Sequence, residues 1–212
     1  MTIDLIVDTP QGEGRFVTRR APRPIATLLL GHGAGKGIES RDLQALARHL
    51  PRQGITVVCF EQPWVRAGRK LATAPATLDE ALMAAADRLR IRTPLILGGR
   101  SAGARSAVRC AKSMGAAGAL ALAFPLHPPG KPEKSRAAEL ANSRVPTLVI
   151  QGDRDPMGLP EEFAPGTELS VVAGADHEFA VPVRGALTQE DALAVIVEAA
   201  LEWIVREVVG ND

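Results

Sequence analysis

The feature that most constrains this chain is a short apolar run that meets a serine between two glycines. Residues 95–97 are apolar and precede the segment Gly99-Arg-Ser-Ala-Gly103, and a helical pattern follows at once. This order is typical of a strand that turns sharply into a helix, with Ser101 at the turn. Strand and helix nearly touch at such a turn, so only small residues fit two positions before and after the serine. The segment therefore predicts a hydroxyl that projects beyond the end of a strand.

Short apolar runs alternate with amphipathic stretches from residue 26 to the end of the chain. The runs that we expect to form strands are 26–30, 55–60, 95–97, 119–124, 147–151 and 169–172. Strands that alternate with helices form a mainly parallel sheet with helices on both faces. Two earlier runs, 3–7 and 15–19, predict an antiparallel pair at one edge of that sheet. A length of 212 residues suits a single α/β domain over 1–212.

Polar residues at three positions predict helix starts. Ser40 is expected to cap the helix that follows it, and Thr188 the final helix. The segment Thr77-Leu-Asp-Glu80 matches a capping box, which predicts a helix from there to about Arg90.

Composition excludes several classes of partner. The net charge is +1, which predicts no nucleic-acid or membrane partner, and no apolar run is long enough to span a bilayer. Aromatic residues make up only 3%, so stacking platforms for bases are not expected. Without a signal peptide the prediction is a cytoplasmic protein, with Cys59 and Cys110 as buried free thiols. We expect a small-molecule substrate, no metal or cofactor, and a monomer or homodimer.

A glycine-rich segment, Gly31-His-Gly-Ala-Gly-Lys-Gly37, follows an expected strand. It lacks the spacing of a phosphate-binding P-loop and of a dinucleotide-binding loop. A loop that presents backbone N–H groups to an oxyanion fits better. Ala34 is then the expected donor, with Gly35 as the alternative, and His32 is expected to support the loop.

Candidate acid and base residues also follow expected strands. Asp153 and Asp155 come after the run at 147–151, and His177 comes after the run at 169–172. The carboxyl ends of parallel strands meet at one edge of a sheet, so these side chains and Ser101 are expected to converge there.

Five segments together resemble the α/β hydrolases, in particular the small, capless, dienelactone-hydrolase-like serine hydrolases. The resemblance covers residues 3–209 and is carried by HGAG at 32–35, GGRSAGAR at 98–105, FPLHPPGKPEK at 124–134, QGDRDPMG at 151–158 and GADHEF at 174–179. Dienelactone hydrolase itself has a cysteine nucleophile where this chain has Ser101. No insertion is long enough for a helical cap, so the pocket is expected to be shallow and open.

The resemblance implies a role for each of these residues. Ser101 would be the nucleophile, His177 the general base, and Asp155 the acid that orients the imidazole. Asp155 fits the family pattern better than Asp153, which is expected to cap a loop, and Asp176 is a weaker alternative. Backbone N–H groups of Ala34 and Ala102 would form the oxyanion hole.

The expected activity is hydrolysis of a carboxylic ester, thioester or lactone through an acyl-enzyme on Ser101. An acyltransferase with the same three residues and a non-catalytic binding or scaffold module are the alternatives. The weaker pocket candidates are His32, Gly35, Arg100 and His127. Basic residues near the motifs hint at an acidic substrate group, namely Lys36, Arg100, Lys131 and Lys134.

Overall fold

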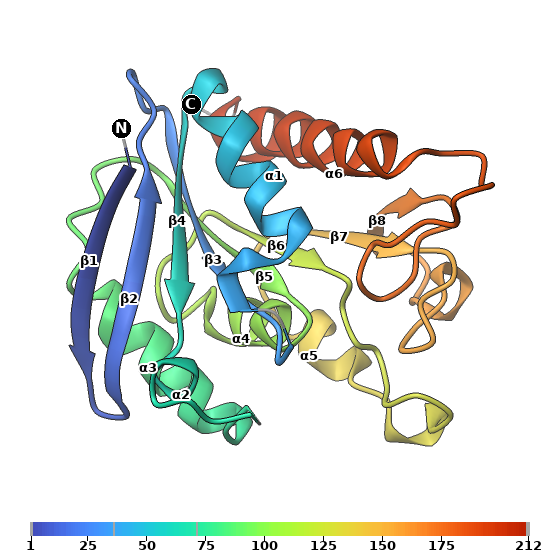
Figure 1. The fold of residues 1–212 in the computed structure, drawn as a ribbon, viewed down its shortest axis with the longest axis horizontal. Coiled ribbons are helices and arrows are strands. Elements are labelled where there is room, and N and C mark those ends of the chain that lie inside the picture. The colour runs from blue at the N-terminus through green and yellow to red at the C-terminus, as the bar shows by residue number, and fades with distance from the viewer. Residues whose placement is uncertain (1, 36, 71, 211–212) are drawn as a thin grey trace.

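The computed structural model describes residues 2–35, 37–70 and 72–210. Within these ranges the centre is one sheet of eight strands in the order β1-β2-β4-β3-β5-β6-β7-β8 (Figure 1). The strands are β1 (Thr2–Thr9), β2 (Gly12–Arg19), β3 (Ala26–Gly31), β4 (Ile55–Glu61), β5 (Leu95–Arg100), β6 (Gly118–Leu122), β7 (Thr147–Gly152) and β8 (Glu168–Val172). β1 pairs antiparallel with β2, and β2 with β4, whereas every pairing from β4 to β8 is parallel. The predicted mainly parallel sheet with an antiparallel edge is confirmed.

Helices cover both faces of this sheet (Figure 1). The α-helices are α1 (Arg41–His49), α2 (Pro63–Arg66), α3 (Pro75–Ala86), α4 (Ala102–Cys110), α5 (Ala137–Ala141) and α6 (Gln189–Ile204). Short 3-10 turns lie at Gly37–Glu39, Leu50–Gln53, Pro132–Lys134 and Pro160–Glu162, and the π-helical turn Val205–Val209 continues α6. Across the described ranges, no helix has both the length and the apolar character needed to cross a bilayer.

The alternation of side chains along a strand divides the core into two layers. In β3, Leu28 and Leu30 belong to the layer under α1 and α6, whereas Leu29 belongs to the layer under α3 and α4. All three are fully buried, because successive side chains of a strand point to opposite faces and both faces here are covered. Trp203 of α6 and Val108 of α4 are buried in these two layers. Burying one such side chain stabilises the fold by about 1.5–3 kcal/mol.

Two of the three predicted helix starts are confirmed. Thr188 caps α6, and its Oγ1 accepts a hydrogen bond from Asp191 N at 3.1 Å. Ser40 occupies the N-cap position of α1 but makes no capping hydrogen bond. The capping box at 77–80 is wrong, because α3 begins at Pro75, whose fixed φ suits the first turn of a helix. That helix ends at Ala86, four residues earlier than predicted.

Both cysteines are buried free thiols, as predicted. Burial raises the pKa of Cys59 to about 12, and burial likewise raises the pKa of Cys110 to about 12. A thiol with so high a pKa holds almost no thiolate near neutral pH, so neither side chain is a ready nucleophile.

Candidate active site

Ser101 stands on a strained turn between β5 and α4. Its backbone φ is 53° and ψ is −110°, a combination that side chains other than glycine rarely adopt. Such strain costs on the order of 1–3 kcal/mol and persists only where the surroundings enforce it. A Cβ at Gly103 would lie 2.4 Å from the carbonyl oxygen of Gly31, and a Cβ at Gly99 only 2.6 Å from the carbonyl carbon of Gly103. The close approach of β5 and α4 that Gly99 and Gly103 predicted is therefore present.

Three side chains from separate loops form one hydrogen-bonded chain at the carboxyl edge of the sheet. Ser101 Oγ lies 3.0 Å from His177 Nε2, and His177 Nδ1 lies 2.7 Å from Asp155 Oδ2. A carboxylate only accepts, so Nδ1–H donates to Asp155 and Nε2 is left to accept from the hydroxyl. This arrangement allows the imidazole to take the proton of the serine while the carboxylate holds its orientation.

Asp155 is fixed from several sides. Its side chain is fully buried; Oδ2 accepts a hydrogen bond from Gln151 Nε2 at 2.8 Å, and Oδ1 accepts one from Met157 N at 2.8 Å. Gln151 is also fully buried and donates to the carbonyl of Gly158 at 2.9 Å. Gln151 is not among the residues predicted from the sequence, although a polar residue at the end of an otherwise apolar strand was the available signal.

The other two carboxylates considered near the imidazole bind backbone groups instead. Asp153 Oδ1 accepts a hydrogen bond from Gly174 N at 2.7 Å, which ties the loop after β7 to the loop after β8. Asp176 Oδ1 accepts hydrogen bonds from Glu178 N at 2.8 Å and Ala180 N at 2.9 Å. Of the three aspartates, the structure places Asp155 against His177.

His32 supports the glycine-rich loop after β3. Its Nε2 accepts a hydrogen bond from Gln62 N at 3.0 Å, and its Nδ1 lies 2.7 Å from the carbonyl oxygen of Gly33. The ring also packs on Trp64 of α2, with centroids 5.6 Å apart. Burial lowers the pKa of His32, so the ring is neutral and Nδ1–H donates to Gly33. With both nitrogens engaged, His32 is placed to hold the loop rather than to contact a substrate.

The glycine-rich loop itself lies against the serine. A Cβ added at Gly33 would lie 3.4 Å from Ser101 Cβ, so the backbone of Gly33 lies close to the serine. Ala34 and Gly35 are exposed, and a side chain at Gly35 would meet open space. Ala102 is the first residue of α4. Lys36 lies outside the described residues.

His127 binds protein groups through both ring nitrogens. Nδ1 lies 2.9 Å from the carbonyl oxygen of Pro128, and Nε2 lies 3.1 Å from Glu162 Oε1. The residue is buried, and its backbone N–H donates to the carbonyl of Met157 at 3.0 Å. These contacts place His127 as a tie between two loops.

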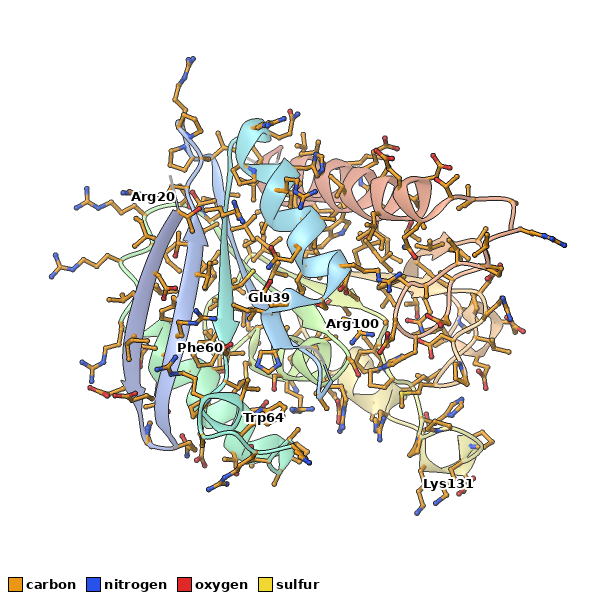
Figure 2. All side chains as sticks on the ribbon, viewed as in Figure 1. Arg20, Glu39, Phe60, Trp64, Arg100 and Lys131 are labelled. Carbon is orange, nitrogen blue, oxygen red and sulfur yellow. The ribbon has the colours of Figure 1, made fainter. Side chains whose placement is uncertain are left out.

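Arg100 does not line an exposed pocket as expected. Its side chain is buried, with 6% of the residue exposed, and its guanidinium donates a hydrogen bond to the carbonyl oxygen of His177. Figure 2 shows Arg100 near the centre of the molecule. The reason is its position at the end of β5, where the side chain is enclosed between α1 and the loops that follow β3 and β8. Lys131 and Lys134 are exposed, and Figure 2 shows Lys131 at the periphery of the molecule.

Comparison with known families identifies the fold. A family model described as an alpha/beta hydrolase domain matches residues 24–205.

The chain belongs to the α/β hydrolase family.

A curated relative of this α/β hydrolase is named "Putative protein-lysine deacylase ABHD14B" and comes from Pongo abelii. The two sequences are 28% identical over 185 residues, which is 80% of this chain and 85% of the relative.

Solved structures confirm the lidless form of the fold. A serine hydrolase without a lid from Xanthomonas campestris matches with a TM-score of 0.75 at 21% identity, over 95% of this chain and 94% of that one. Dienelactone hydrolase from Anabaena variabilis matches with a TM-score of 0.75 at 18% identity, over 98% of each chain. At these identities the likeness concerns the fold. In the described ranges, the connections between strands hold no inserted cap domain either.

Proposed function

We propose that this α/β hydrolase cleaves a carboxylic ester, thioester or lactone through an acyl-enzyme on Ser101. The observation that carries the proposal is the continuous chain from Ser101 Oγ to His177 Nε2 at 3.0 Å and from His177 Nδ1 to Asp155 Oδ2 at 2.7 Å. A serine on a strained turn that reaches an imidazole, itself held by a buried carboxylate, is the arrangement that nucleophilic acyl transfer needs.

The proposed first step forms the acyl-enzyme. Ser101 Oγ attacks the carbonyl carbon of the substrate while His177 Nε2 takes the hydroxyl proton. The imidazolium then donates that proton to the leaving oxygen or sulfur, and the bond to the leaving group breaks. Asp155 holds the imidazole in the tautomer that this transfer requires and stabilises its positive charge.

Two backbone N–H groups are proposed to stabilise the oxyanion. That of Ala102 is at the N-terminus of α4, where the helix dipole favours negative charge, and that of Ala34 is in the loop that lies against Ser101. Losing one such donor raises the barrier by about 3 kcal/mol in enzymes where it has been measured.

The second step would release the acyl group to water. A water molecule takes the place of the leaving group, and its oxygen bonds to the acyl carbon as His177 removes its proton. His177 then returns that proton to Ser101 Oγ as the acyl bond to Ser101 breaks, which releases the acid. An acceptor other than water would make the same intermediate an acyltransferase intermediate. The name of the Pongo abelii relative refers to lysine deacylation, so an acyl-lysine peptide is a reasoned addition to any substrate panel.

Active-site labelling tests the proposal directly. The wild-type protein is expected to react covalently with a fluorophosphonate probe and to hydrolyse at least one of a panel of p-nitrophenyl esters, thioesters and lactones. Ser101→Ala removes the nucleophile, so labelling is expected to disappear and kcat to fall by on the order of 10⁵-fold or more. A wild-type protein that is neither labelled nor active on any panel member would contradict the proposal.

A further inference from the structure

We propose that Arg100 is a positioning residue that holds the His177 loop in register with Ser101, with Asp42 as its buried counter-ion. This inference rests on the proposed hydrolase function, because it concerns how the general base reaches the nucleophile. It assigns a role to a charged pair behind the site that the serine–imidazole–carboxylate chain leaves unexplained.

The guanidinium of Arg100 bridges two separate elements. Its Nη2 donates a hydrogen bond to the carbonyl oxygen of His177 at 2.7 Å. Its Nε lies 3.4 Å from Asp42 Oδ2, and Asp42, in α1, is fully buried. Arg100 directly precedes Ser101, so the residue that binds the backbone of His177 is also the chain neighbour of the nucleophile.

A third contact brings in the proposed oxyanion loop. A Cβ at Gly33 would lie 2.9 Å from Arg100 Nη1 and 3.4 Å from Ser101 Cβ. Gly33 therefore lies close to both the guanidinium and the nucleophilic residue. One side chain thus touches the loops after β3 and β8 and the helix α1, so its placement affects both the base and the proposed oxyanion donors.

The energetics of the Arg100–Asp42 ion pair favour a role in positioning the His177 loop over a role in stability alone. A buried ion pair is a weak source of stability, since apolar residues of similar volume often serve as well or better, although removing one partner alone is costly. Burial raises the pKa of Asp42, and the positive charge of Arg100 opposes part of that rise.

The loop that Arg100 grips has its own internal bonds, which make it measurable. Asp176 N donates to the carbonyl of Ala180 at 3.0 Å, and Phe179 N donates to the carbonyl of Asp176 at 2.9 Å. Amide hydrogen exchange over residues 174–180 therefore reports how firmly the loop is held, independently of catalysis.

Two variants separate positioning from folding. Arg100→Lys keeps a positive charge for Asp42 but lacks the fork that reaches two partners at once. The double variant Arg100→Met with Asp42→Leu removes both charges, so no uncompensated charge is left in the core. In both, we expect kcat and the rate of fluorophosphonate labelling to fall about 10- to 100-fold, because a misplacement near 1 Å has an effect of this size. KM is expected to change by less than about threefold, and exchange over 174–180 to become faster.

Arg109→Lys is the matched control. Arg109 is a partly buried arginine of α4 that pairs with Asp79 at 2.7 Å and Glu139 at 3.0 Å. The same exchange of arginine for lysine there is expected to leave kcat and the exchange of residues 174–180 unchanged.

Each outcome decides one question. If the wild-type protein is neither labelled nor active, the proposed function fails. Amide hydrogen exchange over residues 174–180 still tests whether Arg100 holds the His177 loop. If the double variant melts close to the wild-type Tm and shows wild-type kcat, Arg100 has only a structural role and the inference is overturned. Unchanged exchange over 174–180 in Arg100→Lys overturns it as well, even if the double variant does not fold.

Discussion

Two aspartates separated by a single residue make different contacts in this molecule. Asp155 is buried and lies 2.7 Å from His177 Nδ1, whereas Asp153 accepts a hydrogen bond from the backbone of Gly174. The chain turns directly after β7, so the two carboxylates leave the strand in different directions. A pair so close in sequence and so different in contacts offers a controlled comparison.

Asp155→Asn is expected to lower kcat by on the order of 10⁴-fold with little change in KM. The amide cannot hold the same imidazole tautomer, and the equivalent loss in a serine protease has this size. Steady-state kinetics on the best panel substrate measures the effect.

Asp153→Asn is the matched control, since it changes the same type of side chain two residues away. We expect kcat within about tenfold of wild type. If the two variants have equal kcat values, the assignment of Asp155 as the orienting acid is incorrect.

At the scale of elements, the loops after β6 and β7 are held together by a pair that depends on pH. The pKa of His127 is raised above its ordinary 6.5 by its hydrogen bond to the Pro128 carbonyl and by Glu162. The pKa of Glu162 is lowered below its ordinary 4.5 by the Leu159 N–H and by His127. The contribution of His127 to the stability of the fold is complete below pH 6.5 and is lost as the pH rises through its raised pKa. The contribution of Glu162 is complete above pH 4.5 and is lost as the pH falls through its lowered pKa.

Glu162→Gln is therefore expected to lower Tm at pH 5.5 and to have little effect at pH 9. Gln keeps an oxygen for the Leu159 N–H, which donates to Glu162 Oε2 at 2.6 Å, but removes the charge that faces His127. A partly exposed pair of this kind contributes up to about 1 kcal/mol, which for a chain of this size is a shift in Tm of roughly 2–4 °C. Thermal denaturation followed by circular dichroism at both pH values checks this, and an equal loss at both would show that the charge is not involved.

At the scale of the whole molecule, one sheet separates the two core layers and joins them. Leu28 and Leu29 are neighbours in β3 yet belong to different layers. Because both layers pack on the same strand, unfolding that strand disrupts both. We infer from this shared sheet that residues 2–210 unfold as a single unit.

The two tryptophans make this cooperativity measurable. Trp64 lies in α2 beside the ring of His32, and Trp203 lies in α6, where its Nε1 donates to Glu168 at 3.0 Å. In the single-tryptophan variants Trp64→Phe and Trp203→Phe, the fluorescence and circular dichroism midpoints in urea are expected to coincide. A fluorescence midpoint that differs from the circular dichroism midpoint in either variant would reveal a separately unfolding part.

The limits of sequence patterns are visible in α6. The apolar pattern predicts a buried face made of Leu193, Val197, Ala200, Leu201, Ile204 and Val208. Of these, Ala200, Ile204 and Val208 are buried, whereas Leu193, Val197 and Leu201 are only partly buried. Ile196 and Trp203, which lie outside the predicted face, are buried as well. A helix with many apolar residues has no single dominant stripe, so its rotation is set by what it packs against.

Local chemistry was enough to determine the strand order along the chain, the sharp turn at Ser101 and the candidates Asp155 and His177. Each of these depends on short-range patterns: apolar runs, glycines where backbones touch, and polar residues just after strands. The contact between Asp155 and the imidazole, and the inward turn of Arg100, were decided only by the tertiary structure. Those contacts join segments far apart along the chain, and they exist because the parallel strands bring their carboxyl ends to one edge.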